Sequence, residues 1–283
     1  MNFLNILNQL AEVDSNVFDR FDSRRAVFSS LGTVAKRSAL AAAPVLITSM
    51  FQKAYAGTNA GDPIEVLNYA LTLEYLEADF YNKMKASPFF ATASSADQAA
   101  INQISKHETA HVALLRTVIS GVGGASAVGA PVSFKTSTFA TLTSFQAQLA
   151  IAQQLEDIGV RAYKGRATDL QGLPDVNVPN VGTINALESA LRIHSVEARH
   201  AAHIRVMRGQ TPWINGNGDL DSQPAYTGTT PENNVTQAGY NLTSAGVITP
   251  GVTYSAADVQ AAFDEILTKA EVLDNSRAGS LVQ

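Results

Sequence analysis

Two short stretches of the sequence each hold a glutamate and a histidine three positions apart. HETAH contains Glu108 and His111, and VEARH contains Glu197 and His200. Residues three apart lie on one side of an α-helix, so both side chains of a pair can reach the same point in a helical core. Carboxylate and imidazole groups are ligands for iron, manganese and zinc. Each stretch is therefore a candidate half of a metal site.

Each Glu-x-x-His pair is preceded by a segment with a glutamate and a tyrosine seven positions apart. Glu74 and Tyr81 precede the first pair, and Glu156 and Tyr163 precede the second. The chain thus carries one coarse internal duplication, and two such sets are much rarer by chance than one. Four carboxylates and two imidazoles on four helices are the ligand set of dimetal carboxylate bundles.

The charges of this set fit two divalent ions, because the negative charge of four carboxylates equals the positive charge of two such ions. Without metal, several of the carboxylates would have to take up protons to stay buried together. Metal binding should therefore stabilise the fold. The alternative is that these glutamates and histidines only form hydrogen bonds in the core.

Apolar residues recur at steps of three and four, which predicts helices that can place these residues together. The predicted ranges are about 62–85, 95–120, 138–166 and 183–207. Asp62 and Pro63 form a helix-start signal. The glycine-rich run from Gly121 to Pro131, with the residues up to Ser137, is too long for a tight turn and reads as a crossover. We expect an all-α four-helix bundle with one long crossover.

Composition divides the chain into three parts: residues 1–57, the bundle at 58–208 and a loop-rich extension at 209–283. The extension is rich in Gly, Pro, Asn and Thr up to Gly251, which predicts ordered loop around the bundle. A final short helical segment is expected from Ser255 to Asn275.

The first 57 residues have the parts of a twin-arginine export leader. They contain SRRAVF, then the weakly hydrophobic run SALAAAPVLITSMF, and finally AYA. The run is too short for a stable membrane span after processing. These features predict a periplasmic or otherwise exported protein. The alternative is a cytoplasmic protein that retains this segment as an N-terminal amphipathic helix.

Composition also excludes several functions. The formal net charge is -5, and the basic residues are scattered, so the chain lacks the basic surface that binds nucleic acid. It contains no cysteine, which excludes disulfides, thiolate zinc sites and iron–sulfur clusters. A hydrophobic content of 46% is sufficient for a packed core.

The motifs resemble those of the ferritin-like superfamily. LNYALTLEYLEADFY (Leu67 to Tyr81) together with HETAH is similar to exported ferritin-like domain proteins related to plant desiccation proteins. The resemblance covers about Asp62 to Met207. It implies a metal-ligand set of terminal Glu74 and Glu156, bridging Glu108 and Glu197, and one histidine on each metal, His111 and His200. It also implies that the hydroxyls of Tyr81 and Tyr163 bond to ligating carboxylates, the alternative being ordinary core packing.

Other ionisable residues near the motifs are expected to stay outside the ligand set. Glu77 could be an extra ligand or a proton carrier, but a solvated side chain is the main expectation. Glu188 should lie on the exposed side of its helix. His107, His194 and His203 do not match ligand positions, and surface roles or contacts beside the ligands are expected for them.

The resemblance implies a dimetal oxidoreductase, with iron as the first choice of metal and manganese as the second. Its small-molecule partner would be dioxygen or hydrogen peroxide, as in ferroxidases and peroxidases. The alternatives are manganese-catalase-like peroxide disproportionation, an iron store, and a non-catalytic protein of stress protection. A homo-oligomer is compatible with all of these.

Overall fold

The computed structural model describes residues 62–173, 175–178, 182–215, 223–244, 246 and 252–282. The predicted export leader at 1–57 lies outside the described residues. Within the described ranges, no helix combines the length and apolar character that a membrane span requires.

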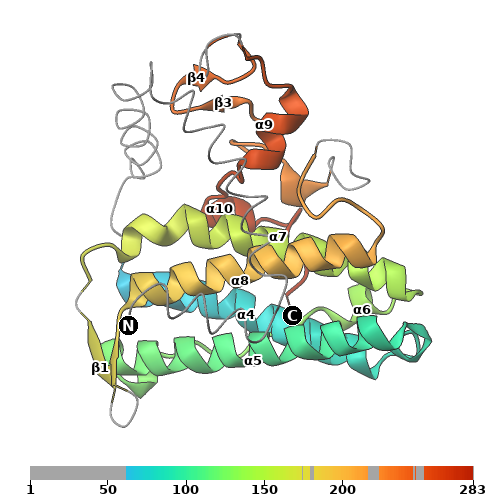
Figure 1. Cartoon of the computed structure of the whole chain (residues 1–283). Helices are drawn as coiled ribbons and strands as arrows, with labels where there is room; N and C mark the ends of the chain where they lie inside the picture. The colour runs from blue at the N-terminus through green and yellow to red at the C-terminus, as the bar shows by residue number, and fades with distance from the viewer. Residues whose placement is uncertain are drawn as a thin grey trace, which may run out of the picture. The chain divides into compact units, whose positions relative to one another are not determined.

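Four long helices lie alongside one another and form one bundle (Figure 1). They are α4 (Pro63–Ala86), α5 (Ser95–Gly123), α7 (Phe145–Arg166) and α8 (Ala186–Met207). α4 packs along α5, and α7 packs along α8. A short link with the turn η1 (Phe90–Thr92) joins α4 to α5, whereas the connection from α5 to α7 is long and includes η2 (Ala125–Ala127) and α6 (Thr136–Phe139). The predicted all-α bundle with one long crossover is confirmed.

The third helix starts later than predicted. The expected start was about Thr138, but that region is the separate short helix α6. α7 begins at Phe145, because the hydroxyl of Ser144 caps it by accepting a hydrogen bond from the backbone N–H of Ala147.

The fourth helix also starts later than predicted. α7 continues into η3 (Ala167–Leu170), and residues expected to begin the helix at Thr183 instead form β2 (Gly182–Ile184). β2 pairs antiparallel with β1 (Val176–Val178). The side chain of Asn185 then caps α8 by accepting a hydrogen bond from the N–H of Glu188.

The bundle interior has a charged layer between two apolar clusters. On α5, the first Glu-x-x-His pair lies between Ile104 of one cluster and Leu115 of the other. On α8, the second pair lies between Ile193 and Ile204, in the opposite order of clusters. The two apolar layers close the charged layer along the bundle axis, where the helices hold the six predicted ligands.

The C-terminal helix is not continuous. The prediction of one helical segment from Ser255 to Asn275 is wrong, because the structure has α9 (Ala256–Ala262) and α10 (Lys269–Val272) with extended chain between them. Each short helix starts at its own capping box, built on Ser255 and on Thr268. The remaining short elements are η4 (Pro224–Tyr226), β3 (Thr236–Gln237), β4 (Tyr240–Asn241) and η5 (Ala278–Ser280), and β3 pairs antiparallel with β4.

The extended chain between α9 and α10 lies directly on α7. The N–H of Leu267 donates to the carbonyl of Arg161 at 3.2 Å, and Leu267 is fully buried. Gly165 permits this close approach, because a Cβ there would lie 2.2 Å from the carbonyl oxygen of Leu267.

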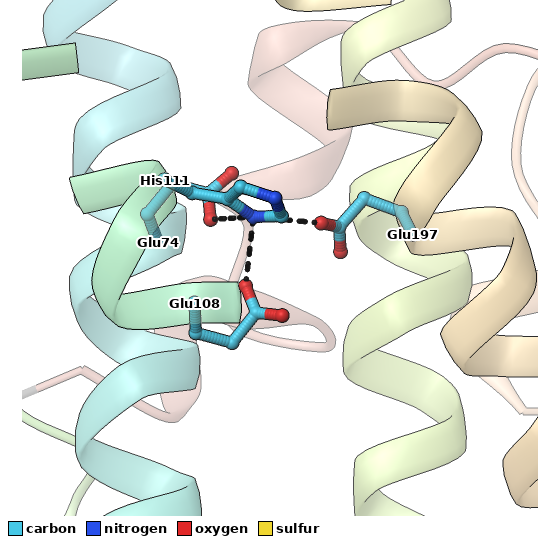
Figure 2. Close-up of side chains that lie close together, drawn as sticks. All are labelled: Glu74, Glu108, His111 and Glu197. Carbon is cyan, nitrogen blue, oxygen red and sulfur yellow. Dashed lines mark hydrogen bonds and ion pairs between the residues drawn. The ribbon is translucent and has the colours of Figure 1, made fainter. Parts of the chain in front are cut away.

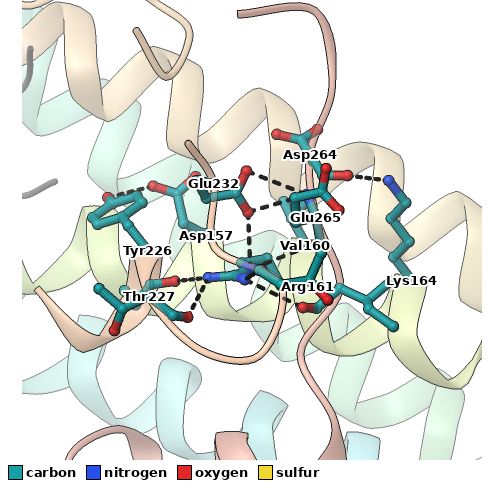
Figure 3. A network of polar contacts seen from close by, with 12 residues as sticks. Asp157, Val160, Arg161, Lys164, Tyr226, Thr227, Glu232, Asp264 and Glu265 are labelled. Carbon is teal, nitrogen blue, oxygen red and sulfur yellow. Dashed lines mark hydrogen bonds and ion pairs between the residues drawn. The ribbon is translucent and has the colours of Figure 1, made fainter. Parts of the chain in front are cut away.

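One buried arginine fastens this extension to the bundle (Figure 3). The Nε atom of Arg161 lies 2.8 Å from a carboxylate oxygen of Glu232. Its guanidinium also donates to backbone carbonyls of the extension, those of Ala225, Thr227, Thr230, Glu265 and Ile266. Beside it, the hydroxyl of Tyr226 donates to Asp157 at 2.6 Å. Two parts of the extension that are far apart in the sequence therefore both bind the guanidinium of Arg161 on α7.

We predict that Arg161→Met destabilises the protein by about 3–5 kcal/mol, because it leaves a buried carboxylate and several carbonyls without their donor. Urea unfolding of the metal-free protein measures this. The matched control is Arg192→Met, since Arg192 and its partner Glu188 are exposed on α8, and its effect should stay below about 1 kcal/mol. Equal effects of the two substitutions would contradict the role of Arg161 in holding the C-terminal extension on the bundle.

Candidate metal centre

The six predicted ligand side chains converge in the charged layer of the bundle. Each of α4 and α7 contributes one glutamate, and each of α5 and α8 contributes one Glu-x-x-His pair. The four carboxylates are fully buried, while His111 and His200 are 8% and 5% exposed. Figure 2 shows Glu74, Glu108, His111 and Glu197 pointing toward one another from their helices.

The ligand atoms form two overlapping groups. One comprises Glu74, Glu108, His111 and Glu197, and the other comprises Glu108, Glu156, Glu197 and His200. Within each group the candidate ligand atoms all lie within 4.8 Å of one another. The groups share Glu108 and Glu197, so these two carboxylates lie where bridging ligands of two metal ions would be.

Both histidines point the same ring nitrogen at the carboxylates. Nδ1 of His111 lies 3.1 Å from Glu74, 3.2 Å from Glu108 and 3.3 Å from Glu197. Nδ1 of His200 lies 3.0 Å from both Glu108 and Glu156. The two halves of the internal duplication are therefore related in space as well as in sequence.

Each of the two tyrosines donates a hydrogen bond to a predicted terminal ligand. The tyrosine and the glutamate of each such pair come from different halves of the internal duplication. The hydroxyl of Tyr81 donates to Glu156, and the hydroxyl of Tyr163 donates to Glu74 at 2.5 Å. Each tyrosine thus fixes one oxygen of the carboxylate from the other half. Sequence spacing alone links Tyr81 with Glu74, so it could not predict this exchange.

Glu77 is a fifth buried carboxylate, and the expectation of a solvated side chain is wrong. It is only 2% exposed, because it lies one turn after Glu74 on the inner side of α4. Gly159 on α7 leaves room for it: a Cβ there would lie 3.0 Å from Glu197 and 3.5 Å from Glu77. The signal in the sequence was the i, i+3 spacing of two glutamates on one apolar stripe.

The other neighbours divide between surface and interior. Glu188 is exposed as expected and pairs with Arg192, and His203 is exposed. His194 is half-buried, with Nδ1 3.0 Å from the carbonyl of Val160. His107 is half-buried as well, and its Nδ1 lies 2.9 Å from Nε2 of His200.

Burial dominates the protonation of three carboxylates. It raises the pKa of Glu74 to about 7 and, with repulsion from neighbouring carboxylates, the pKa values of Glu77 and Glu197 well above their usual range. Among the described residues, neither carboxylate oxygen of Glu197 accepts a well-formed hydrogen bond, and one of them has only the 3.3 Å contact with Nδ1 of His111. Buried carboxylate oxygens with so few hydrogen bonds, grouped with imidazole nitrogens, suit hard or borderline divalent ions.

For Glu108 and the two histidines, attraction between carboxylate and imidazole outweighs the effect of burial on the pKa. Burial would raise the pKa of Glu108, but its contacts with His111 and His200 outweigh this and lower it to about 2. Burial likewise would lower the pKa of His200, but Glu156 and Glu108 raise it to about 10. The neighbouring carboxylates raise the pKa of His111 in the same way. Protons thus balance the charge of the metal-free centre.

A cleft between α5 and α8 leads to the histidines. It has a volume of about 490 Å³ and includes His107, His111, His200 and His203 in its lining. The cleft leaves one side of the centre open to small molecules, whereas apolar layers close the centre along the bundle axis.

Comparison with known protein families relates the chain to a described domain family. The profile of the ferritin-like domain family matches residues 62–210, a range that contains all four long helices. No curated protein and no solved structure matches the chain significantly.

We predict that divalent metal raises the melting temperature more at about pH 8 than at about pH 6. Because the folded-state pKa values of Glu74, Glu197 and both histidines are raised, bound protons stabilise the metal-free fold at low pH, and this contribution is lost as the pH rises through about 7 and above. Metal must displace these protons, so it adds less at low pH. Calorimetric melting with and without Mn²⁺ tests this; an equal shift at both pH values would refute it.

We also predict opposite effects of Glu197→Gln on the two forms. It should stabilise the metal-free protein at about pH 8 by on the order of 1–3 kcal/mol, because it removes a buried carboxylate that Glu74, Glu108 and Glu156 repel, and it should abolish stabilisation by metal. The control, Glu188→Gln, removes an exposed carboxylate of the same helix and should leave both quantities unchanged. Loss of stability in the metal-free Glu197→Gln variant would argue that Glu197 has a structural role instead.

Proposed function

Because the chain belongs to the ferritin-like family, we propose that it is a dimetal carboxylate protein that binds two divalent ions, iron foremost, and acts as an oxidoreductase on dioxygen or hydrogen peroxide. The observation that carries this proposal is the pair of overlapping ligand groups that share Glu108 and Glu197. A core that only needed hydrogen bonds would not gather four buried carboxylates around two imidazole nitrogens.

The proposed ligand roles follow the two groups. Glu74 and His111 would hold one ion, Glu156 and His200 would hold the other, and the shared Glu108 and Glu197 would bridge them. Two such ions supply paired one-electron redox changes and Lewis acidity.

The chain's own residues would orient and shield the centre. Tyr81 and Tyr163 hold one oxygen of each terminal carboxylate. The second oxygen of each faces Nδ1 of a histidine and would be free to bind metal. The apolar layers exclude bulk water along the bundle axis, and the cleft beside His111 and His200 provides an approach for a small oxidant. A ligand set of imidazole and carboxylate suits iron and manganese alike.

We further propose that the protein works outside the cytoplasm. Support comes from the sequence alone, in the paired arginines, short apolar run and AYA step of residues 1–57. The twin-arginine route carries folded proteins, so a centre loaded with metal before export is consistent with a ligand set buried in the bundle.

The proposal predicts that metal-free protein takes up two Fe²⁺ per chain without oxygen. On addition of air or hydrogen peroxide, near-ultraviolet absorption of ferric iron should appear together with consumption of the oxidant. His200→Ala should lose at least one ion and most of the oxidation, whereas His203→Ala, which removes an exposed histidine of the same cleft, should retain both. Uptake of many ions per chain, or two bound ions that do not react with either oxidant, would contradict the proposed oxidoreductase.

A further inference from the structure

The two halves of the centre differ at the residue before each bridging glutamate. His107 precedes Glu108, whereas Val196 precedes Glu197. Both residues line the cleft between α5 and α8. One half thus has an imidazole, with hydrogen-bonding nitrogens, at a position where the other half has only an alkyl group.

His107 contacts the outward nitrogen of a predicted ligand. Its Nδ1 lies 2.9 Å from Nε2 of His200. The two ring planes are within 7° of parallel with their centroids 5.2 Å apart, which together with the short nitrogen–nitrogen distance describes an edge-to-edge hydrogen bond in the ring plane. The side-chain amide nitrogen, Nε2, of Gln103 lies 2.7 Å from the other ring nitrogen, Nε2, of His107. His107 is therefore held at both ring nitrogens.

The hydrogen bond constrains how His200 can act. Its Nδ1 faces Glu108 and Glu156, so a metal bound there requires the ring proton to sit on Nε2. That N–H then donates to Nδ1 of His107, which leaves the His107 proton on Nε2. A half-turn of the Gln103 side-chain amide places its oxygen at Nε2 of His107 as the acceptor. Such a bond fixes the tautomer and orientation of a ligating histidine and increases its basicity.

His111 lacks the corresponding support. Its Nδ1 also faces carboxylates, but no described residue is hydrogen-bonded to its Nε2, and the side chain of Val196 has no acceptor. The bond that preorganises one histidine is therefore absent, within the described part of the chain, from the other.

We propose that His107 is a positioning residue that makes the two metal positions inequivalent. The position of His200 and Glu156 binds its ion first and more tightly, and the position of His111 and Glu74 fills second. This inference rests on the proposed dimetal function, and it adds an order of loading that the six ligands alone do not imply.

Titration of the metal-free full-length protein with Mn²⁺ tests the proposal, followed by calorimetry and by electron paramagnetic resonance. The wild-type protein should bind in two steps and show signals of isolated ions at one equivalent. His107→Leu, which removes the acceptor, should weaken the tighter step by about 10–100-fold and give spin-coupled pairs already at one equivalent. His107→Asn, whose side-chain oxygen can still accept a hydrogen bond from Nε2 of His200, should retain two separate steps.

A gain-of-function variant provides the converse test. Val196→His copies the pattern of the first half and offers an acceptor to His111, so it should tighten the weaker step and bring the two affinities together. His203→Ala is the control, because His203 lines the same cleft but is exposed, and its isotherm should match that of the wild type.

Three results would overturn the inference. An unchanged isotherm for His107→Leu, or equal weakening of both steps with lower stability of the metal-free protein, would reduce His107 to a cleft or packing residue while leaving the dimetal function intact. Absence of Mn²⁺ and Fe²⁺ binding by the wild type would instead overturn the proposed function and, with it, this inference.

Discussion

The structure depends on one electrostatic constraint, which is the burial of five carboxylates in a single layer of a helical bundle. Glu74, Glu77, Glu108, Glu156 and Glu197 are all nearly or fully inaccessible to solvent. Like charges at such separations cannot all persist in a dry interior, so protons, imidazolium groups or metal ions must balance them. The helix starts, the inner stripes and the space left at Gly159 all serve to bring these groups together.

The surroundings of this layer keep it rigid and dry. Apolar clusters lie on both sides of it along the bundle axis, and tyrosine hydroxyls fix the outer carboxylates. On the outside of α7, Arg161 binds the C-terminal extension through a buried ion pair and several carbonyls. The helix that carries Glu156 and Tyr163 is thereby held from both faces, which suits a centre whose geometry must not relax when its charge changes.

Sequence spacing was sufficient to predict the bundle and the convergence of the six candidate ligands. A helix places residues at i and i+3 on one face, so the spacing translates directly into proximity. Duplication made the pattern specific. The same spacing places Glu77 inside, one turn from Glu74, against the general tendency of glutamate to be exposed. Contacts between helices, such as Tyr81 with Glu156 and His107 with His200, depend on packing angles that no local pattern encodes. The break between α9 and α10 follows from strong local caps and from contacts with α7.

The central claim is that two metal ions lie side by side between the paired Glu-x-x-His motifs. X-ray absorption spectroscopy of the iron-loaded, full-length protein tests it most directly, because it detects scattering from a neighbouring metal and from imidazole rings. The account predicts a metal–metal distance of about 3.5–4 Å, an oxygen-rich shell and one imidazole per ion. Isolated ions with no metal neighbour, or a shell without imidazole, would contradict it.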